Sequence, residues 1–154
     1  MTGKVTMSQP DLASRPFDVT VEREMAASPE AIYRAWTEQF DLWFAAPGHV
    51  LMRAEVGEPF AFQTIHEDSM QPHYGRFLAL KPGRHVEMTW VTGRLGTAGA
   101  ETVVSVELTP GDGGTGTRLR LTHSGFYDQA AADKHEEAWA RHVLLDDVLA
   151  AAGA

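Results

Sequence analysis

Residues 128–152, which read DQAAADKHEEAWARHVLLDDVLAAA, decide the fold of this chain. The stretch contains neither Gly nor Pro, and it is rich in Ala, Leu and Glu, which are strong helix formers. Asp128 is a good N-cap residue, and Gly153 follows the end of the stretch. At about 1.5 Å per residue the predicted helix is roughly 35 Å long, which is the width of a small domain.

One face of this predicted helix is largely apolar. Its residues recur at the i, i+3, i+4, i+7 spacing of a helix that lies on an apolar surface. The stripe consists of His135, Ala138, Trp139, His142, Leu145 and Leu149. Because the chain before it has the pattern of strands, we expect a sheet to provide the surface that the stripe covers.

Length and composition predict one domain without disulfide bonds. We expect residues 1–16 to be a flexible lead-in and residues 17–152 to form a single domain, and the 154-residue chain contains no Cys. A net charge of −8 argues against nucleic-acid or anionic-membrane partners. No apolar run reaches the ~18 residues of a membrane span, and the N-terminus lacks the apolar core of a signal peptide, so we expect a cytoplasmic protein without membrane insertion.

Alternating apolar and polar residues predict seven strands. The first contains Phe17, Val19 and Val21. The other six are expected at residues 50–54, 60–64, 74–80, 85–92, 102–108 and 118–123. The polar segment 65–73 is interpreted as a loop or a frayed hairpin end. Since most connections between consecutive strands are short, the strands should pair antiparallel.

Two short helices are expected between the first two strands. Ser28, Pro29 and Glu30 are typical of a helix start, because Ser caps, Pro suits the first turn and Glu favours the positive end of the helix dipole. A second helical piece is expected just before the second strand. An aromatic cluster extends across both pieces and consists of Trp36, Phe40, Trp43 and Phe44. The cluster either fills one end of a core or forms the wall of a pocket.

Several stretches of the chain occur in this same order in a known group of proteins. They are SPEAIYRAWT at 28–37, YGRF at 74–77, KPG at 81–83, LTHSGF at 121–126 and Trp139 in the last helix. With them the chain resembles the helix-grip, START-like (SRPBCC) superfamily, and within it the family of homologues of the activator of the heat-shock chaperone ATPase. Ala138 stands where that family usually has Gly, and Gly57-Glu58 where it often has a Gly pair.

The resemblance implies an α+β helix-grip fold. In this fold a curved antiparallel sheet of about seven strands wraps around a long C-terminal helix, and two short helices follow the first strand. An apolar cavity is expected between sheet and helix. The superfamily includes ligand binders, enzymes and chaperone-associated domains, so the fold alone does not choose a function.

The leading functional prediction is the binding of a small apolar or aromatic ligand in this cavity, without a cofactor. Aromatic walls with a few polar groups are typical of ligand pockets. The residues predicted to line the cavity are Trp43, Phe62, Trp90, His123, Phe126, His135, Trp139 and His142. No metal site is predicted, because the histidines lack HxH or HExxH spacing.

Two alternatives stay open. One is an enzyme of the cyclase, dehydratase or hydrolase kind, in which His123 or His142 is the general acid or base. The sequence offers no nucleophile motif for it, and no catalytic residue is assigned. The other alternative is a protein-interaction domain associated with a chaperone or with the stress response. A homodimer is compatible with every one of these functions.

Overall fold

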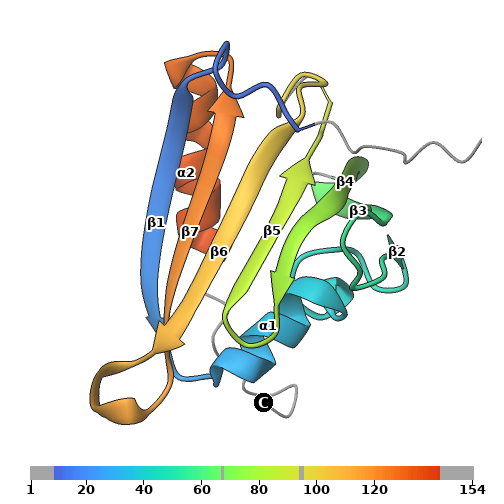
Figure 1. The fold of residues 1–154 in the computed structure, drawn as a ribbon. Coiled ribbons are helices and arrows are strands. Elements are labelled where there is room, and N and C mark those ends of the chain that lie inside the picture. Colours follow the sequence, from blue (N-terminus) through green and yellow to red (C-terminus); the bar gives the residue numbers. More distant parts are fainter. Residues whose placement is uncertain (1–8, 67, 94–95, 143–154) are drawn as a thin grey trace, which may run out of the picture.

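The computed structural model describes residues 9–66, 68–93 and 96–142 (Figure 1). Its elements are β1 Phe17–Met25, α1 Pro29–Thr37, the 3₁₀ helix η1 Phe40–Leu42, β2 Val50–Leu51, β3 Pro59–His66, β4 Ser69–Lys81, β5 His85–Trp90, β6 Thr102–Pro110, the 3₁₀ helix η2 Asp112–Gly114, β7 Thr117–Phe126 and α2 Gln129–His142. The α+β class and the six strands predicted after the first are confirmed.

The strands form one antiparallel sheet in the order β1-β7-β6-β5-β4-β3-β2. β1 and β2 therefore lie at opposite edges, and α1 and η1 carry the chain from one edge to the other. α2 packs against β1 and β7, whereas α1 packs against β5 and β6 (Figure 1). Both helices add side chains to one core cluster on the inner face of the sheet.

Both helices begin where the sequence predicts. The Ser28 hydroxyl accepts a hydrogen bond from the backbone N–H of Ala31 at 3.2 Å, as an N-cap residue does. Asp128 does the same for Ala131 at 2.8 Å. The predicted end of the long helix, with Leu145 and Leu149, lies outside the described residues.

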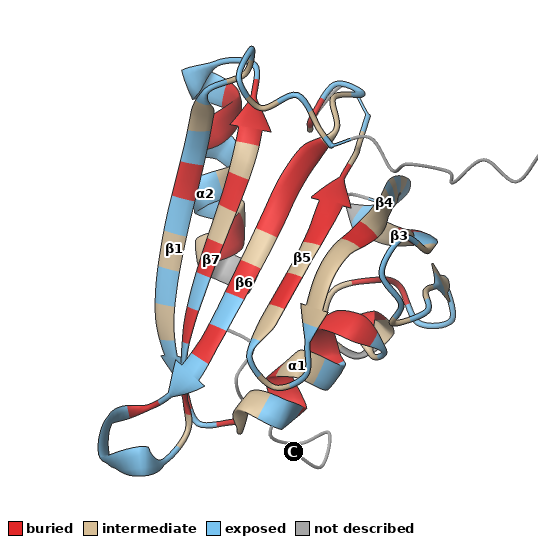
Figure 2. Cartoon of the chain, in the orientation of Figure 1, coloured by how far each residue is buried: buried red, intermediate tan, exposed pale blue. Residues whose placement is uncertain are grey.

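Alternation along the strands separates the two faces of the sheet. Buried and exposed residues alternate along β1 and β7 (Figure 2). The inner face is filled by large side chains, of which Phe62, Phe77, Val86, Met88, Val104, Val106, Leu119 and Leu121 are at most 2% exposed. The alternation that predicted these strands thus places their large apolar side chains on one face of the sheet.

Two predicted boundaries need correction. The strand expected at 50–54 is only Val50–Leu51, because the backbone turns at Arg53, whose carbonyl accepts the N–H of Glu55 at 2.8 Å. Of the two interpretations of segment 65–73, the hairpin end is the closer one, because residues 65–66 end β3 and residues 69–73 begin β4. Asp68 in the hairpin turn has φ of 62°, a left-handed conformation that Asp tolerates.

Pro72 lies within this hairpin, on β4. A Pro cannot donate to a strand ladder and is confined to edges. In the structure Pro72 lies opposite Gln63 of β3, and pairing of β4 with the β5 side begins only at Tyr74, which bridges to Val91. No neighbour therefore needs a Pro72 N–H. The consequence for the site is that His73, next in the chain, lies on a strand rather than in a solvated loop.

Candidate functional site

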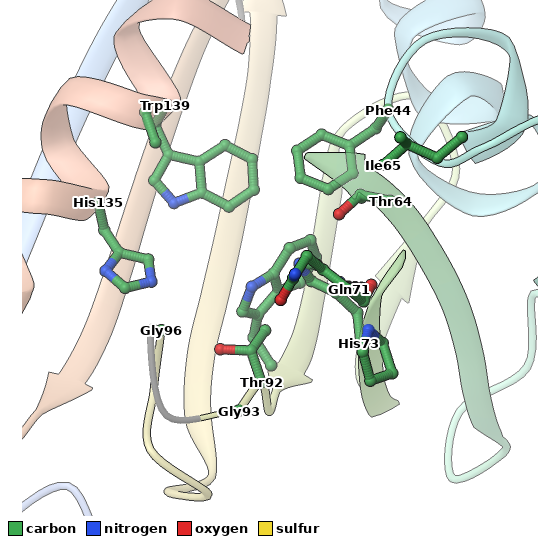
Figure 3. A pocket seen from close by; sticks show the side chains of 13 residues that line it. Phe44, Thr64, Ile65, Gln71, His73, Thr92, Gly93, Gly96, His135 and Trp139 are labelled. Atoms are coloured by element: carbon green, nitrogen blue, oxygen red, sulfur yellow. Dashed lines mark hydrogen bonds between the residues drawn. The ribbon is translucent and has the colours of Figure 1, made fainter. Parts of the chain in front are cut away.

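A pocket of about 360 Å³ lies between α2 and the β3–β4 hairpin, with the β5–β6 loop at one end (Figure 3). Its described lining combines aromatic, small and uncharged polar residues. These are Phe44, Thr64, Ile65, Gln71, Pro72, His73, Trp90, Thr92, Gly93, Gly96, His135, Ala138 and Trp139. The volume falls within the ~300–1,000 Å³ that is usual for small-molecule sites.

The aromatic walls support one another. The Trp139 ring of α2 stacks on Phe44 with centroids 5.7 Å apart and planes 24° apart. It also contacts Trp90 at 5.2 Å, and Phe44 contacts Trp90 edge-to-face at 5.6 Å. Because each ring is held by the others, the apolar walls exist before any ligand enters.

The polar groups of the pocket come from several elements. His135 and Trp139 project from α2, and Figure 3 shows His135 across the pocket from Thr64. His73 lies on β4, where its ring stacks on Phe62 at 4.8 Å and its Nδ1 donates to the Gln71 carbonyl at 3.1 Å. Among the described lining residues there is no Asp, Glu, Lys or Arg.

The described residues of the β5–β6 loop form a rim at one end of the pocket. The backbone N–H of Thr92 donates to the Thr97 hydroxyl at 2.9 Å, and the N–H of Thr97 donates to the Thr92 hydroxyl at 2.7 Å. Thr97 is fully buried. A Cβ on Gly96 would collide with the Thr92 hydroxyl, so glycine is required there. The rim is thus held by reciprocal hydrogen bonds.

His123 lies behind the pocket in a hydrogen-bond chain that determines its tautomer. The Trp139 indole N–H, which can only donate, points at His123 Nδ1 at 2.9 Å, so Nδ1 is the acceptor. Thr102 donates its hydroxyl hydrogen to the Trp90 carbonyl at 2.6 Å. It must therefore accept from His123 Nε2–H, which is 2.7 Å away. Each polar hydrogen in this hydrogen-bond chain therefore has one position.

Burial lowers the pKa of His123 well below its usual value, and the neighbouring His135 lowers it further. The hydrogen-bond chain acts in the same direction, because a proton on Nδ1 would face the Trp139 N–H. His123 is fully buried and is not among the lining residues. Its role in this structure is to tie α2 to the sheet and to orient the Trp139 ring.

His135 is half-buried and has a different environment. Its Nδ1 donates to the Ala131 carbonyl, one helical turn back, at 2.7 Å. Its ring packs against Phe126 at 4.5 Å and against His123 at 5.1 Å. Burial lowers the pKa of His135; the bond to the Ala131 carbonyl opposes this, and the charge of Lys134 adds to it. The ring is thus neutral near pH 7, and its orientation is determined.

The structure brings together only some of the residues that the sequence singled out. Trp90, His135 and Trp139 line the pocket. The others that can be placed, Trp43, Phe62, His123 and Phe126, are not among the lining residues. The side chain of His142 lies outside the described part of the structure. A ligand-binding role for all eight stays a prediction.

Sequence reasoning missed other lining residues, among them Phe44, Gln71, His73 and Thr92. Phe44 carried a signal, since it belonged to the aromatic cluster that could form a pocket wall. Gln71 and His73 carried none, because their segment was interpreted as a loop or a frayed hairpin end. Among the described residues no three His, Cys, Asp or Glu lie close enough to hold a metal ion. None of the described helices is long and apolar enough to cross a membrane.

A seven-stranded antiparallel sheet that carries a C-terminal helix, with a pocket beneath that helix, defines a helix-grip domain. The family described as Activator of Hsp90 ATPase homolog 1-like protein matches residues 26–150. The chain belongs to this family.

Solved structures agree with this assignment. Protein MLL2253 from Mesorhizobium loti is 27% identical with a TM-score of 0.71, over 86% of this chain and 96% of that one. The AHSA1 protein from Silicibacter pomeroyi is 25% identical with a TM-score of 0.70, over 88% and 98%. The Aha1 dimer from Colwellia psychrerythraea shares the fold at 23% identity and a TM-score of 0.63, over 86% and 96%. No curated protein matches the chain.

Proposed function

We propose that this protein is a binding domain that holds a small, uncharged, largely aromatic molecule in the pocket beneath α2. The observation that carries the proposal is the pocket itself, about 360 Å³ with walls of Phe44, Trp90 and Trp139. Aromatic rings that already pack on one another lose little freedom when a flat ligand joins them. Burial of the ligand's apolar surface would supply most of the affinity.

The absence of charged side chains from the described lining supports an uncharged ligand. An anion or a cation would lose its hydration in this pocket, and the described lining residues offer no opposite charge to replace it. The polar groups that are present, such as the Gln71 amide and the Thr92 hydroxyl, can orient a ligand by hydrogen bonds.

Native mass spectrometry of the purified protein is the first test. A mass excess that disappears on denaturation would identify a bound molecule. Titration with 2-methoxynaphthalene, followed by quenching of tryptophan fluorescence, then measures the affinity for an aromatic probe. We expect saturable quenching, because Trp90 and Trp139 both line the pocket.

A matched pair of variants locates the binding. Ala138 lines the pocket on α2, whereas Ala130 is exposed on the same helix. Ala138→Phe fills the pocket and should weaken probe binding at least tenfold, and Ala130→Phe should leave the affinity unchanged. Equal affinities in both variants and the wild type would place the probe elsewhere and would remove the support for a site under α2.

The alternative of an enzyme that uses inward histidines has less support. His123 cannot accept a proton without losing the bond from Trp139, and it does not line the pocket. Acid–base chemistry through His142 stays a prediction, since its side chain lies outside the described part of the structure.

We also propose that this protein forms a homodimer. The dimer of the Colwellia psychrerythraea protein supports it by analogy. Exposed apolar side chains on the β2–β4 side, among them Leu51 and Tyr74, offer a surface for self-association. Sedimentation velocity over a range of concentrations would detect the dimer. A constant monomer mass would remove this proposal without affecting the pocket.

A further inference from the structure

The second nitrogen of His135 is unused by the described protein. Nδ1 donates to the Ala131 carbonyl at 2.7 Å, and a carbonyl oxygen can only accept, so Nδ1 carries the hydrogen. In the neutral ring Nε2 therefore presents a lone pair. Among the described residues nothing donates to this lone pair. The only buried side-chain nitrogen or oxygen without a partner in the described residues is Nε of Arg23, so Nε2 of His135 is not buried. It is consequently accessible, and His135 lines the pocket.

The ring of His135 has little freedom to reverse this arrangement. Phe126 lies against it at 4.5 Å and His123 meets it edge-to-face at 5.1 Å. Rotation of the ring by 180° would also break the bond to Ala131. Figure 3 shows the ring beside Trp139, on the side of the pocket opposite Phe44. His135 thus presents an acceptor whose direction is set before a ligand arrives.

The neighbouring donors do not compete for this acceptor. The Trp139 indole N–H is committed to His123 at 2.9 Å. The Trp90 indole N–H has no acceptor among the described residues, and by the same argument it is not buried. Trp90 lines the same pocket, so this indole N–H and the His135 lone pair both belong to residues of its lining. A ligand hydroxyl can donate to the acceptor and can also accept a hydrogen bond.

We propose that Nε2 of His135 determines specificity by accepting a hydrogen bond from the ligand, so that the pocket prefers uncharged aromatic molecules that carry a hydroxyl group, of the phenol or naphthol class. The proposal rests on the proposed function, because it names the chemistry of the molecule in the same pocket. A ligand without the hydroxyl group excludes water from Nε2 but offers it no hydrogen bond. The lost bond produces the difference in affinity between the two kinds of ligand.

Two probes of nearly equal shape test the proposal. 2-Naphthol donates through its hydroxyl group, whereas 2-methoxynaphthalene has the same rings but no donor. Isothermal titration calorimetry of the wild-type protein at pH 7.5 should give about tenfold tighter binding of 2-naphthol, the equivalent of about 1.4 kcal/mol for one hydrogen bond. Equal affinities would overturn the selectivity but leave the proposed function standing. If neither probe binds, both proposals are overturned.

Two variants assign the selectivity to His135. His135→Phe keeps an aromatic ring but removes the acceptor, so the affinity for 2-naphthol should fall to that for 2-methoxynaphthalene and the preference should disappear. His135→Gln keeps an acceptor oxygen near the position of Nε2 and should retain part of the preference. Circular dichroism melting curves check that both variants fold. A His135→Phe protein that still prefers 2-naphthol tenfold would overturn the assignment, and so would a His135→Gln protein that prefers 2-methoxynaphthalene.

Discussion

The aromatic side chains of α1 and η1 and those at the pocket beside α2 belong to one continuous cluster but have different surroundings. Trp36 on α1 is 2% exposed, and Phe40 on η1 is fully buried. Beside α2, Phe44 and His135 are only half-buried and lie at the pocket. The difference comes from the residues between the rings. α1 meets large side chains of the sheet, whereas the pocket is lined by Ala138, Gly93 and Gly96, which leave space.

The comparison shows that aromatic density alone does not distinguish a core from a pocket. The Trp43 indole N–H illustrates the filled region, because it is satisfied internally by the Ala35 carbonyl at 2.8 Å. His135 illustrates the open region, since Nε2 has no partner among the described residues. Polar atoms left unpaired beside small residues are the better sign of a ligand site.

The largest expected effect is a loss of stability in the filled region. Trp36→Ala should lower the free energy of unfolding by about 3–5 kcal/mol, because it empties a closed core. Phe44→Ala should cost less than half as much, since Phe44 is already partly in contact with solvent. Urea unfolding followed by circular dichroism measures both values. Equal losses would mean that the two regions are packed alike.

Enlargement of a small residue sharpens the same comparison. Ala35 on α1 is 1% exposed, so Ala35→Phe forces its neighbours apart and should cost about 3 kcal/mol. The same substitution at Ala138 enters the pocket and should change the free energy of unfolding by less than about 1 kcal/mol. Thermal melting of both variants supplies the check. A severe loss in Ala138→Phe would show that the space beside α2 is not available to a ligand.

The hydrogen-bond chain behind the pocket should be sensitive to a single hydroxyl. Thr102→Val keeps the shape of the side chain but leaves the buried His123 Nε2–H without its acceptor and removes the hydroxyl bond to the Trp90 carbonyl. The free energy of unfolding should fall by about 2 kcal/mol. Thr20→Val is the control, because Thr20 is exposed on β1 and should change little. A Thr102→Val variant with an unchanged free energy of unfolding would contradict the role of the hydrogen-bond chain in anchoring Trp139.

Stability should also decrease in mild acid. The pKa of His123 and that of His135 are lowered in the folded protein, so the unfolded chain, with values near 6.5, takes up protons first. Unfolding is thus favoured as the pH falls below about 6.5, by at most about 1.4 kcal/mol per pH unit for each histidine. Urea unfolding between pH 8 and pH 5 should give a plateau followed by a decline. A flat profile would contradict neutral buried histidines.

The sequence by itself determined the elements and their faces, because these depend on neighbours in the chain. Ser28 and Asp128 predicted both helix starts, and the alternation of residues 102–108 predicted a strand there. Hydrogen bonds at a helix end and the two-residue period of a strand are local properties. The stretches at 28–37, 74–77, 81–83 and 121–126, in their order along the chain, also indicated the family that matches residues 26–150.

The tertiary structure alone decided which of the inward residues line a pocket. Phe62 and Phe44 have the same chemistry, yet Phe62 is 2% exposed and Phe44 lines the pocket. The proton positions of His123 depended on Trp139 and Thr102, which come from two other elements. Pocket space and hydrogen-bond partners arise from residues far apart in the chain, and a pattern within one segment carries no information about what lies across from it.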